Sequence, residues 1–335
     1  TYKASNIIIA SGSSPAKLKN IEIDEDVIVS STGALSFKKV PKKLAVIGAG
    51  YIGLELGSVW NRLGSEVTVI EYADSIVPSM DMDIGITFRN ELQKQGINFL
   101  LLSEVTKAKI KNDEVHIDIN SIKDKKVNKL VFNKALLAVG RTPNIEGMGL
   151  EALGIKFSNK GHIAVSQSYE TSIEGIYAIG DVIEGPMLAH KASMEAQAVV
   201  DIIIGKNGQV NYNAIPSVVY TSPEVAWVGK NQQELDKYKI NYKVGKFQFS
   251  SNSRSKVSGN TTGMIKVYSH SESDKILGAH IIGNHAGEMI GEFVVAIEMG
   301  ATAEDIALIC HAHPTLSESI KEAASLASYG KTIHS

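Results

Sequence analysis

The stretch VIGAGYIGLE, residues 46–55, decides the fold because it joins a strand pattern to a helix pattern through a glycine-rich turn. Its glycines, Gly48, Gly50 and Gly53, have the spacing G-x-G-x-x-G. The apolar run KKLAVIG before them predicts a buried strand, and residues 51–63 follow a helical pattern that ends at a glycine. The stretch therefore predicts a strand–turn–helix unit of a parallel α/β sheet.

Each glycine of this turn has a physical role in binding a dinucleotide. Gly48 makes the tight turn, Gly50 lets a pyrophosphate approach the backbone, and Gly53 lets the helix pack close to the strand. The pyrophosphate then lies on free amides at a helix N-terminus, where the helix dipole favours negative charge. The pattern alone is a weak signal, but its position between a strand and a helix makes a dinucleotide site the expected function.

An acid at the end of the next strand indicates which nucleotide binds. A strand is predicted over EVTVIE, and it ends at Glu71. A carboxylate there would accept hydrogen bonds from a ribose 2′-hydroxyl and repel a 2′-phosphate, and no arginine follows it in EYADSIVP. The prediction is NAD rather than NADP. Glu55, one turn into the first helix, is either a surface acid or a group beside the nicotinamide end.

Composition excludes several functional classes. The net charge is −2 and no basic stripe occurs, so neither nucleic acid nor a membrane surface is expected as a partner. No apolar run of about 18 residues is present, so no spanning helix is expected. A single cysteine excludes an intramolecular disulfide framework and fits a reducing compartment. The first residues lack a signal-peptide pattern and an initiating Met, and they enter directly into a strand-like run, as if in mid-domain.

Strand and helix patterns change character along the chain. Strands alternate with helices across residues 38–158, which predicts a doubly wound parallel sheet, with an antiparallel meander inserted over residues 105–131. A boundary is expected near residues 158–163. Beyond residue 212, short β-rich runs are followed by helix patterns, which predicts a separate α+β domain.

The stretch CHAHPTLSES, residues 310–319, allows three kinds of site. A zinc site would need a second group of ligands, which the sequence does not offer, so no metal is expected. Cys310 closes the apolar face of a helix pattern and is expected to be a buried small side chain rather than a nucleophile. Pro314 suits the first turn of a helix, which would place Glu318 one turn inside and within reach of His313. His313 is then a base oriented by a carboxylate, or else a capping or packed histidine.

Six stretches together resemble the dihydrolipoamide dehydrogenase family of flavin-disulfide oxidoreductases, in order and over essentially the whole chain. They are VIGAGYIGLELGSVWNRLGSEVTVIE, AVGRTPN, IYAIGDVIEGPMLAHKA, PSVVYTSPEVAWVGK, KVGKFQFSSNSRSK and CHAHPTLSES. The HPTLSE and AWVGK segments are more specific than the glycine fingerprint. Related glutathione and mercuric reductases differ in the region of residues 310–320.

The resemblance implies two cofactors, NAD and FAD, and assigns residues to each. The NAD contacts it implies are Gly48, Ala49, Gly50, Tyr51, Ile52, Gly53, Leu54, Glu55, Glu71, Val105 and Gly140. The FAD contacts it implies are Ser11, Gly12, Ser13, Asp181, Met187, Leu188, Ala189 and His190. By the same resemblance, His313 and Glu318 are the catalytic pair that accepts a proton from a dihydrolipoamide thiol, across the interface of a homodimer.

The resemblance also implies the reaction and the partners. Protein-bound dihydrolipoamide is oxidised through a redox disulfide and FAD to NAD⁺, and the partners are lipoyl domains and the E2 core of 2-oxoacid dehydrogenase complexes. The compartment expected is the bacterial cytoplasm, or the mitochondrial matrix in a eukaryote. Two other functions stay open: a non-catalytic NAD-binding or dimerisation module, and a related flavin-disulfide reductase.

The sequence departs from the family in one respect. The family's N-terminal flavin fingerprint and C-x4-C redox pair are not found in these residues, so a C-terminal portion is expected, one that does not catalyse the complete reaction. The domains expected are the tail of an FAD domain (1–37), an NAD domain (38–158), a central segment returning to the FAD domain (159–211) and an interface domain (212–335).

Overall fold

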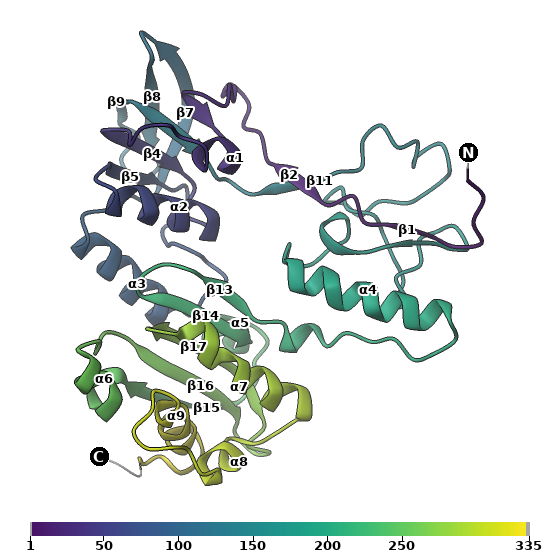
Figure 1. Cartoon of the computed structure of the whole chain (residues 1–335), viewed down its shortest axis with the longest axis vertical. Helices are drawn as coiled ribbons and strands as arrows, with labels where there is room; N and C mark the ends of the chain where they lie inside the picture. Colours follow the sequence, from purple (N-terminus) through teal and green to yellow (C-terminus); the bar gives the residue numbers. More distant parts are fainter. Residues whose placement is uncertain (1, 333–335) are drawn as a thin grey trace. The chain divides into compact units, whose positions relative to one another are not determined.

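The computed structural model describes residues 2–332, and they form two compact units (Figure 1). Among the described residues, the first unit consists of residues 2–16 and Gly140–Tyr212, and the second of Lys17–Val139 and residues 213–332. The second unit contains both the glycine-rich turn and the segment around His313. The first contains every residue that the resemblance assigns to FAD.

A five-stranded parallel sheet forms one half of the second unit, in the order β3-β10-β4-β5-β6. Its strands are β3 (Ile28–Val29), β4 (Lys43–Ile47), β5 (Glu66–Ile70), β6 (Asn98–Leu100) and β10 (Lys134–Leu137). Its helices are α1 (Ser31–Ala34), α2 (Tyr51–Arg62) and α3 (Met82–Lys94). The strand–turn–helix prediction is therefore confirmed, and β4, α2 and β5 each lie within a residue or two of the stretch predicted for them.

Different elements cover the two faces of this sheet. Successive residues of each strand point to opposite faces, so alternate residues show what packs on each. Leu44 and Val46 pack in one apolar cluster with α2 and α3. Ala45 and Ile47 pack in another with the predicted meander, an antiparallel sheet of three strands. Those strands are β7 (Ser103–Lys111), β8 (Glu114–Ser121) and β9 (Val127–Phe132). The second face is thus covered by a small sheet rather than by helices.

A five-stranded antiparallel sheet, in the order β13-β14-β17-β16-β15, forms the other half of the second unit. Its strands are β13 (Ser217–Val219), β14 (Glu224–Gly229), β15 (Tyr242–Gln248), β16 (Met264–His270) and β17 (Ile276–Gly283). The associated helices are η2 (Tyr212–Ala214), α5 (Gln232–Lys237), η3 (Phe249–Ser251), α6 (Ser253–Ser258), α7 (Ala286–Met299), α8 (Ala303–Leu308) and α9 (Glu318–Tyr329). This confirms the predicted α+β region.

Apolar packing joins the two sheets of the second unit. One face of the antiparallel sheet packs against α7, α8 and α9. The opposite face contributes Trp227, Met264 and Ile282 to the same cluster as Ile84 and Phe88 of α3. The glycine-rich turn and the antiparallel sheet therefore belong to one continuous core.

The first unit is built from short pairings and one long helix. β1 (Ile7–Ile9) pairs in parallel with β12 (Ile176–Ala178), and β2 (Ser13–Pro15) pairs antiparallel with β11 (Arg141–Pro143). η1 (Gly180–Val182) follows β12, and α4 (Ala189–Ile203) packs over them through a shared apolar cluster. Segments from the two ends of the unit's sequence thus meet close to Asp181.

Between residues 2 and 332, none of the helices is long and apolar enough to cross a membrane. The fold class is the expected one: a Rossmann-type α/β domain with a flavin-domain segment and an α+β interface domain.

Candidate functional site

Two of the three glycines in the turn pack closely against backbone atoms, and the third has open space beside it. A Cβ on Gly48 would lie 2.4 Å from the Ala138 carbonyl oxygen, and one on Gly53 would lie 2.3 Å from the Gly48 oxygen. Gly48 also has φ of +104°, which favours glycine. A Cβ on Gly50 would meet no atom within 4 Å, and its φ is −76°. The space beside Gly50 is therefore available to a ligand.

Gly50 is the N-cap of α2 and supplies no capping side chain, so the amides of the first turn face this open space. The side chains of the neighbouring residues that are expected around NAD differ in burial. Ala49 and Leu54 have buried side chains, and Tyr51 and Ile52 are half-buried.

Glu71 lies against the turn, as its position after β5 predicts. Its Oε2 accepts a 2.6 Å hydrogen bond from the Ala49 amide, and its Oε1 accepts one of 2.8 Å from the Ala73 amide. Two backbone amides thus fix the carboxylate beside the glycine-rich turn. Its hydrogen bond to a ribose hydroxyl stays a prediction.

Glu55 is half-buried on α2 rather than a free surface acid. Its Oε1 accepts a 2.8 Å hydrogen bond from the Tyr220 amide, directly after β13. Burial raises the pKa of Glu55, and the hydrogen bond from Tyr220 acts in the opposite direction. Its contact with a nucleotide stays a prediction.

The two remaining residues expected around NAD lie outside the turn. Val105 is half-buried on β7, at a bulge, and packs against the apolar cluster below the meander. Gly140 has φ of +123° and open space around it, and it belongs to the first unit. Both assignments rest on the resemblance.

The residues expected to hold FAD converge within the first unit. The Ser13 hydroxyl donates to the Asp181 carboxylate, and Arg141 donates at 2.6 Å to both the hydroxyl and the carbonyl oxygen of Ser13. Ser11 donates to the Asn144 carbonyl oxygen at 2.6 Å, which fixes the neighbouring turn. Gly12 has φ of +73° and no atom within 4 Å of a Cβ position. The loop and Asp181 therefore form one polar surface.

The segment Met187–His190 forms the start of α4. Leu188 is the N-cap and makes no capping hydrogen bond with its side chain, while Ala189 and His190 are exposed in the first turn. A polar ring edge placed there would face backbone amides and the positive end of the helix dipole. The segment can therefore supply the contacts that the resemblance assigns to it.

A buried ion pair that sequence reasoning missed holds η1 in place. Lys191 and Glu195 are fully buried on α4 and lie 3.0 Å apart. Glu195 accepts from the Gly180 amide at 2.7 Å, and Lys191 donates to the Gly180 carbonyl oxygen at 3.1 Å. Both backbone groups of the residue before Asp181 are thus bound to α4.

Tyr212 completes this network, because its hydroxyl donates to Glu195 Oε1 at 2.7 Å. Burial, together with the hydrogen bonds to Tyr169 and Glu195, raises the pKa of Tyr212. A sequence signal for the network exists. Lys191 and Glu195 lie at helical spacing from Ala198 and Val199, the other buried residues of α4, and so belong to its buried face.

His313 and Glu318 are in contact, as predicted. His313 Nδ1 lies 2.9 Å from Glu318 Oε1, and the Thr315 amide donates to Oε2 at 2.8 Å. The placement of Pro314 in the first turn of a helix is wrong, since α9 begins only at Glu318. A non-helical turn, closed by the Glu318 carboxylate, brings the pair together.

The neighbours of His313 have other environments. His311 bonds through Nε2 to Glu292 at 2.8 Å and through Nδ1 to the Ile309 carbonyl oxygen at 3.1 Å, consistent with a structural role. Cys310 is exposed, so its predicted burial is wrong. The reason is that α8 ends at Leu308 and Ile309 is extended, so Cys310 leaves the apolar helix face. No group of three metal-binding side chains occurs in the described part of the chain.

Comparison with known proteins identifies the family. Residues 1–196 match the family described as pyridine nucleotide-disulphide oxidoreductase, and residues 215–324 match its dimerisation domain. The chain belongs to this family. The pyridine nucleotide-disulphide oxidoreductase match covers the glycine-rich turn, Glu71 and the residues around Asp181. The dimerisation-domain match covers His313 and Glu318.

Curated members of the family are similar over nearly the whole chain. Dihydrolipoyl dehydrogenase 1, mitochondrial, of Arabidopsis thaliana is 50% identical over 332 residues, which is 99% of this chain. Dihydrolipoyl dehydrogenase, mitochondrial, of Bos taurus is 50% identical over 331 residues. The chain spans 65% of the length of each of these relatives.

Solved structures of the family have the same fold. LpdA from Mycobacterium tuberculosis superposes with a TM-score of 0.89 at 25% identity, covering 96% of this chain and 70% of that one. The HOCl-induced flavoprotein disulfide reductase RclA from Escherichia coli gives 0.85 at 25% identity, covering 96% and 73%. Membership of the family implies FAD and NAD(H) as cofactors. The open Gly50, and the Ser13–Asp181 surface with the start of α4, fit those two groups.

Proposed function

We propose that this chain acts in a dihydrolipoyl dehydrogenase, which oxidises protein-bound dihydrolipoamide to lipoamide and reduces NAD⁺. The observation that carries the proposal is the hydrogen bond between His313 and Glu318, an oriented imidazole with an exposed ring. The identity of 50% to proteins named dihydrolipoyl dehydrogenase supports the same substrate.

In the proposed reaction, His313 accepts the proton of a substrate thiol. Glu318 binds Nδ1–H, so Nε2 carries the free electron pair, and the carboxylate stabilises the imidazolium that forms. The Thr315 amide fixes the carboxylate, which keeps the ring in one orientation. Deprotonation matters because the thiolate, not the thiol, attacks a disulfide.

The disulfide of the proposed reaction requires cysteines outside these 335 residues, because Cys310 is the only cysteine in the sequence. When bound, FAD would supply the two-electron carrier between thiols and nicotinamide. In this chain, Ser13, Asp181 and the backbone of residues 187–190 would hold it. The turn at Gly50 would bind the NAD pyrophosphate, and Glu71 its ribose.

The proposed partners follow from the proposed substrate. A lipoyl domain carries the dithiol, so the proposed partners are lipoyl domains and the E2 core of a 2-oxoacid dehydrogenase complex. The match to a dimerisation domain supports a homodimer. In that dimer, the proposed role of His313 is to serve the disulfide of the other subunit. The proposed compartment is the bacterial cytoplasm, or the mitochondrial matrix for a eukaryotic source; the similar plant and bovine proteins are named as mitochondrial.

The direct test of the nucleotide assignment is NADH binding by Gly50→Val. A side chain at residue 50 meets no protein atom and suits its backbone angles, so the variant should fold normally. It should nevertheless fill the space that the pyrophosphate needs and abolish NADH binding, measured by fluorescence titration beside the unsubstituted chain. Normal NADH binding by a folded Gly50→Val would contradict the assignment.

A further inference from the structure

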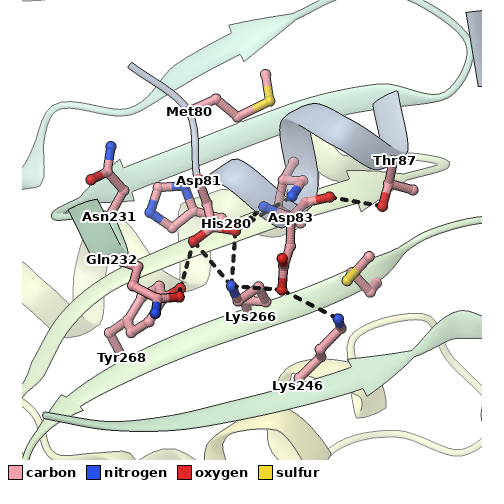
Figure 2. Close-up of polar contacts among 12 residues, drawn as sticks. Met80, Asp81, Asp83, Thr87, Asn231, Gln232, Lys246, Lys266, Tyr268 and His280 are labelled. Carbon is pink, nitrogen blue, oxygen red and sulfur yellow. Dashed lines mark hydrogen bonds and ion pairs between the residues drawn. The ribbon is translucent and has the colours of Figure 1, made fainter. Parts of the chain in front are cut away.

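A buried cluster of charged groups ties the segment before α3 to the antiparallel sheet of the second unit (Figure 2). Lys266 Nζ on β16 lies 2.9 and 3.1 Å from the two carboxylate oxygens of Asp81, and 3.2 Å from Asp83. The Tyr268 hydroxyl also donates to Asp81. The side chains of Lys266 and Asp81 are 3% and 0% exposed, so this pair is shielded from water.

Asp81 is also the N-cap of α3. Its Oδ1 accepts from the amides of Asp83 and Ile84, at 3.1 and 3.3 Å. Burial would raise the pKa of Asp81, but the hydrogen bonds from Tyr268 and Lys266 and the Lys266 charge outweigh burial and lower it. The carboxylate therefore stays ionised and holds the helix start and the sheet together.

Two further side chains, from the start of α5, bind the residues just before Asp81. Asn231 Nδ2 donates to the Ser79 carbonyl oxygen at 3.0 Å, and Gln233 Nε2 donates to that of Met80 at 3.2 Å. Three successive residues, 79 to 81, are thus bound by side chains from β16 and from the start of α5.

The same segment reaches the glycine-rich turn. The Val77 amide donates to the Ala49 carbonyl oxygen at 3.1 Å, and the Ala49 amide donates to Glu71 at 2.6 Å. Both backbone groups of Ala49, the residue between Gly48 and Gly50, are therefore held by residues 71–77. A short stretch of chain then connects Val77 to Asp81.

We propose that Lys266 is a positioning residue for the nucleotide: by fixing Asp81, it holds the segment of residues 77–81 that orients the peptide groups of the glycine-rich turn. The proposal rests on the proposed binding of NAD at that turn. It predicts that a residue of the interface region, with no contact to the turn, changes affinity for the nucleotide. If Lys266 only stabilises the fold, its replacement would lower the unfolding temperature and leave the affinity for the nucleotide unchanged.

The test compares Lys266→Met with two controls in the full chain. Lys243→Met removes a lysine of the same sheet whose ion pair is with Asp274 and is partly exposed. Phe293→Leu lowers stability through the apolar cluster with α7, on the opposite face of the sheet. NADH dissociation constants are measured well below each unfolding midpoint, together with hydrogen exchange of residues 46–54 and 72–83.

The expected result is an NADH dissociation constant about 3- to 30-fold higher in Lys266→Met, with faster exchange in both segments. Both controls should keep the affinity of the unsubstituted chain, although Phe293→Leu unfolds at a lower temperature. Lys266→Met leaves a buried carboxylate without its cation, so the double variant Asp81→Asn/Lys266→Met is made as well, because it leaves no unpaired charge. The same rise is expected there.

An unchanged affinity for NADH in the folded Lys266→Met or double variant would overturn the positioning role. The proposed function would stand in that case, provided that Gly50→Val no longer binds NADH. An equal rise in Phe293→Leu would also overturn it, because general loosening would then explain the effect. An unsubstituted chain that binds no NADH would refute the proposed function itself.

Discussion

Nδ1 of His313 lies 2.9 Å from Oε1 of Glu318, on a turn that precedes α9. The side chain of Glu318 is only 16% exposed, whereas that of His313 is 66% exposed. The carboxylate is therefore fixed from the protein side, and the ring is presented to the surface. This asymmetry suits a base whose substrate arrives from another chain.

Loss of either member of this pair should reduce dihydrolipoamide oxidation. His313→Ala removes the base and is expected to lower turnover by about 10²- to 10⁴-fold, and Glu318→Gln, which keeps the shape but not the charge, should lower it by a smaller factor. The assay needs the family's cysteine pair, so the variants are made in a protein that carries this chain together with that pair.

The matched control for Glu318 is Glu292→Gln, since Glu292 contacts His311 at a similar distance of 2.8 Å. It should leave turnover nearly unchanged. NADH-driven reduction of an artificial electron acceptor, which requires no thiol deprotonation, should survive in all three variants. Full dihydrolipoamide turnover in His313→Ala would remove His313 from the mechanism.

Glu71 should set the preference for NADH over NADPH. Its carboxylate is fixed by the Ala49 and Ala73 amides, beside the turn. Glu71→Ala removes a charged hydrogen-bond acceptor and the repulsion of a 2′-phosphate, so the NADH/NADPH affinity ratio should fall by about 10- to 100-fold. Glu66→Ala, at the exposed start of the same strand, is the control and should keep the ratio. The ratio comes from dissociation constants for both nucleotides, and equal ratios in both variants would contradict this role.

The Lys191–Glu195 pair should control flavin retention. Lys191→Met leaves Glu195 buried without its cation and frees the Gly180 carbonyl oxygen, so the turn that carries Asp181 should shift. In flavin-containing holoprotein, we expect Lys191→Met to lose at least about tenfold in FAD affinity, measured as flavin absorbance relative to protein after dialysis. Gly50→Val should keep its flavin while losing NADH. Full flavin retention by a folded Lys191→Met would show that α4 does not hold the site.

The parts of this fold that the sequence predicts depend on local patterns. The strand, turn and helix around Gly48 are specified by apolar periodicity and by glycines that must pack against backbone, and the structure has them where expected. The contact between His313 and Glu318 was also predictable from local sequence, because the two residues are only five positions apart.

The parts that the sequence did not reveal depend on distant residues. Lys191 and Glu195 share a helix face with the apolar Ala198 and Val199, but their spacing is equally that of an ordinary surface ion pair, and the packing of α4 decides between the two. Lys266 and Asp81 are 185 positions apart, so no periodicity connects them. Cys310 was expected to continue an apolar helix face, but α8 ends two residues earlier. In each case the deciding factor is where an element ends or what packs on it.

The buried His280 next to the Lys266 cluster should make stability depend on pH. Its Nε2 donates to the Lys230 carbonyl oxygen at 3.2 Å, and its Nδ1 has no hydrogen-bond partner among the described residues. Burial lowers the pKa of His280 to about 4; Asp81 and Glu234 act to raise it and Lys266 acts to lower it. The folded state therefore keeps the ring neutral at pH values where the unfolded chain, with a pKa near the ordinary 6.5, is protonated.

Between about pH 6.5 and pH 4 the unfolded chain binds one more proton at this residue than the folded chain. The free energy of unfolding should therefore decrease as the pH is lowered through that range, by up to about 1.4 kcal/mol per pH unit from His280 alone. His280→Gln, which can still donate to Lys230, should show a shallower decline. Urea unfolding from pH 7 to pH 4.5 measures the difference, with His116→Gln on β8 as the control. Parallel curves for His280→Gln and the unsubstituted chain would show that His280 is already charged when folded.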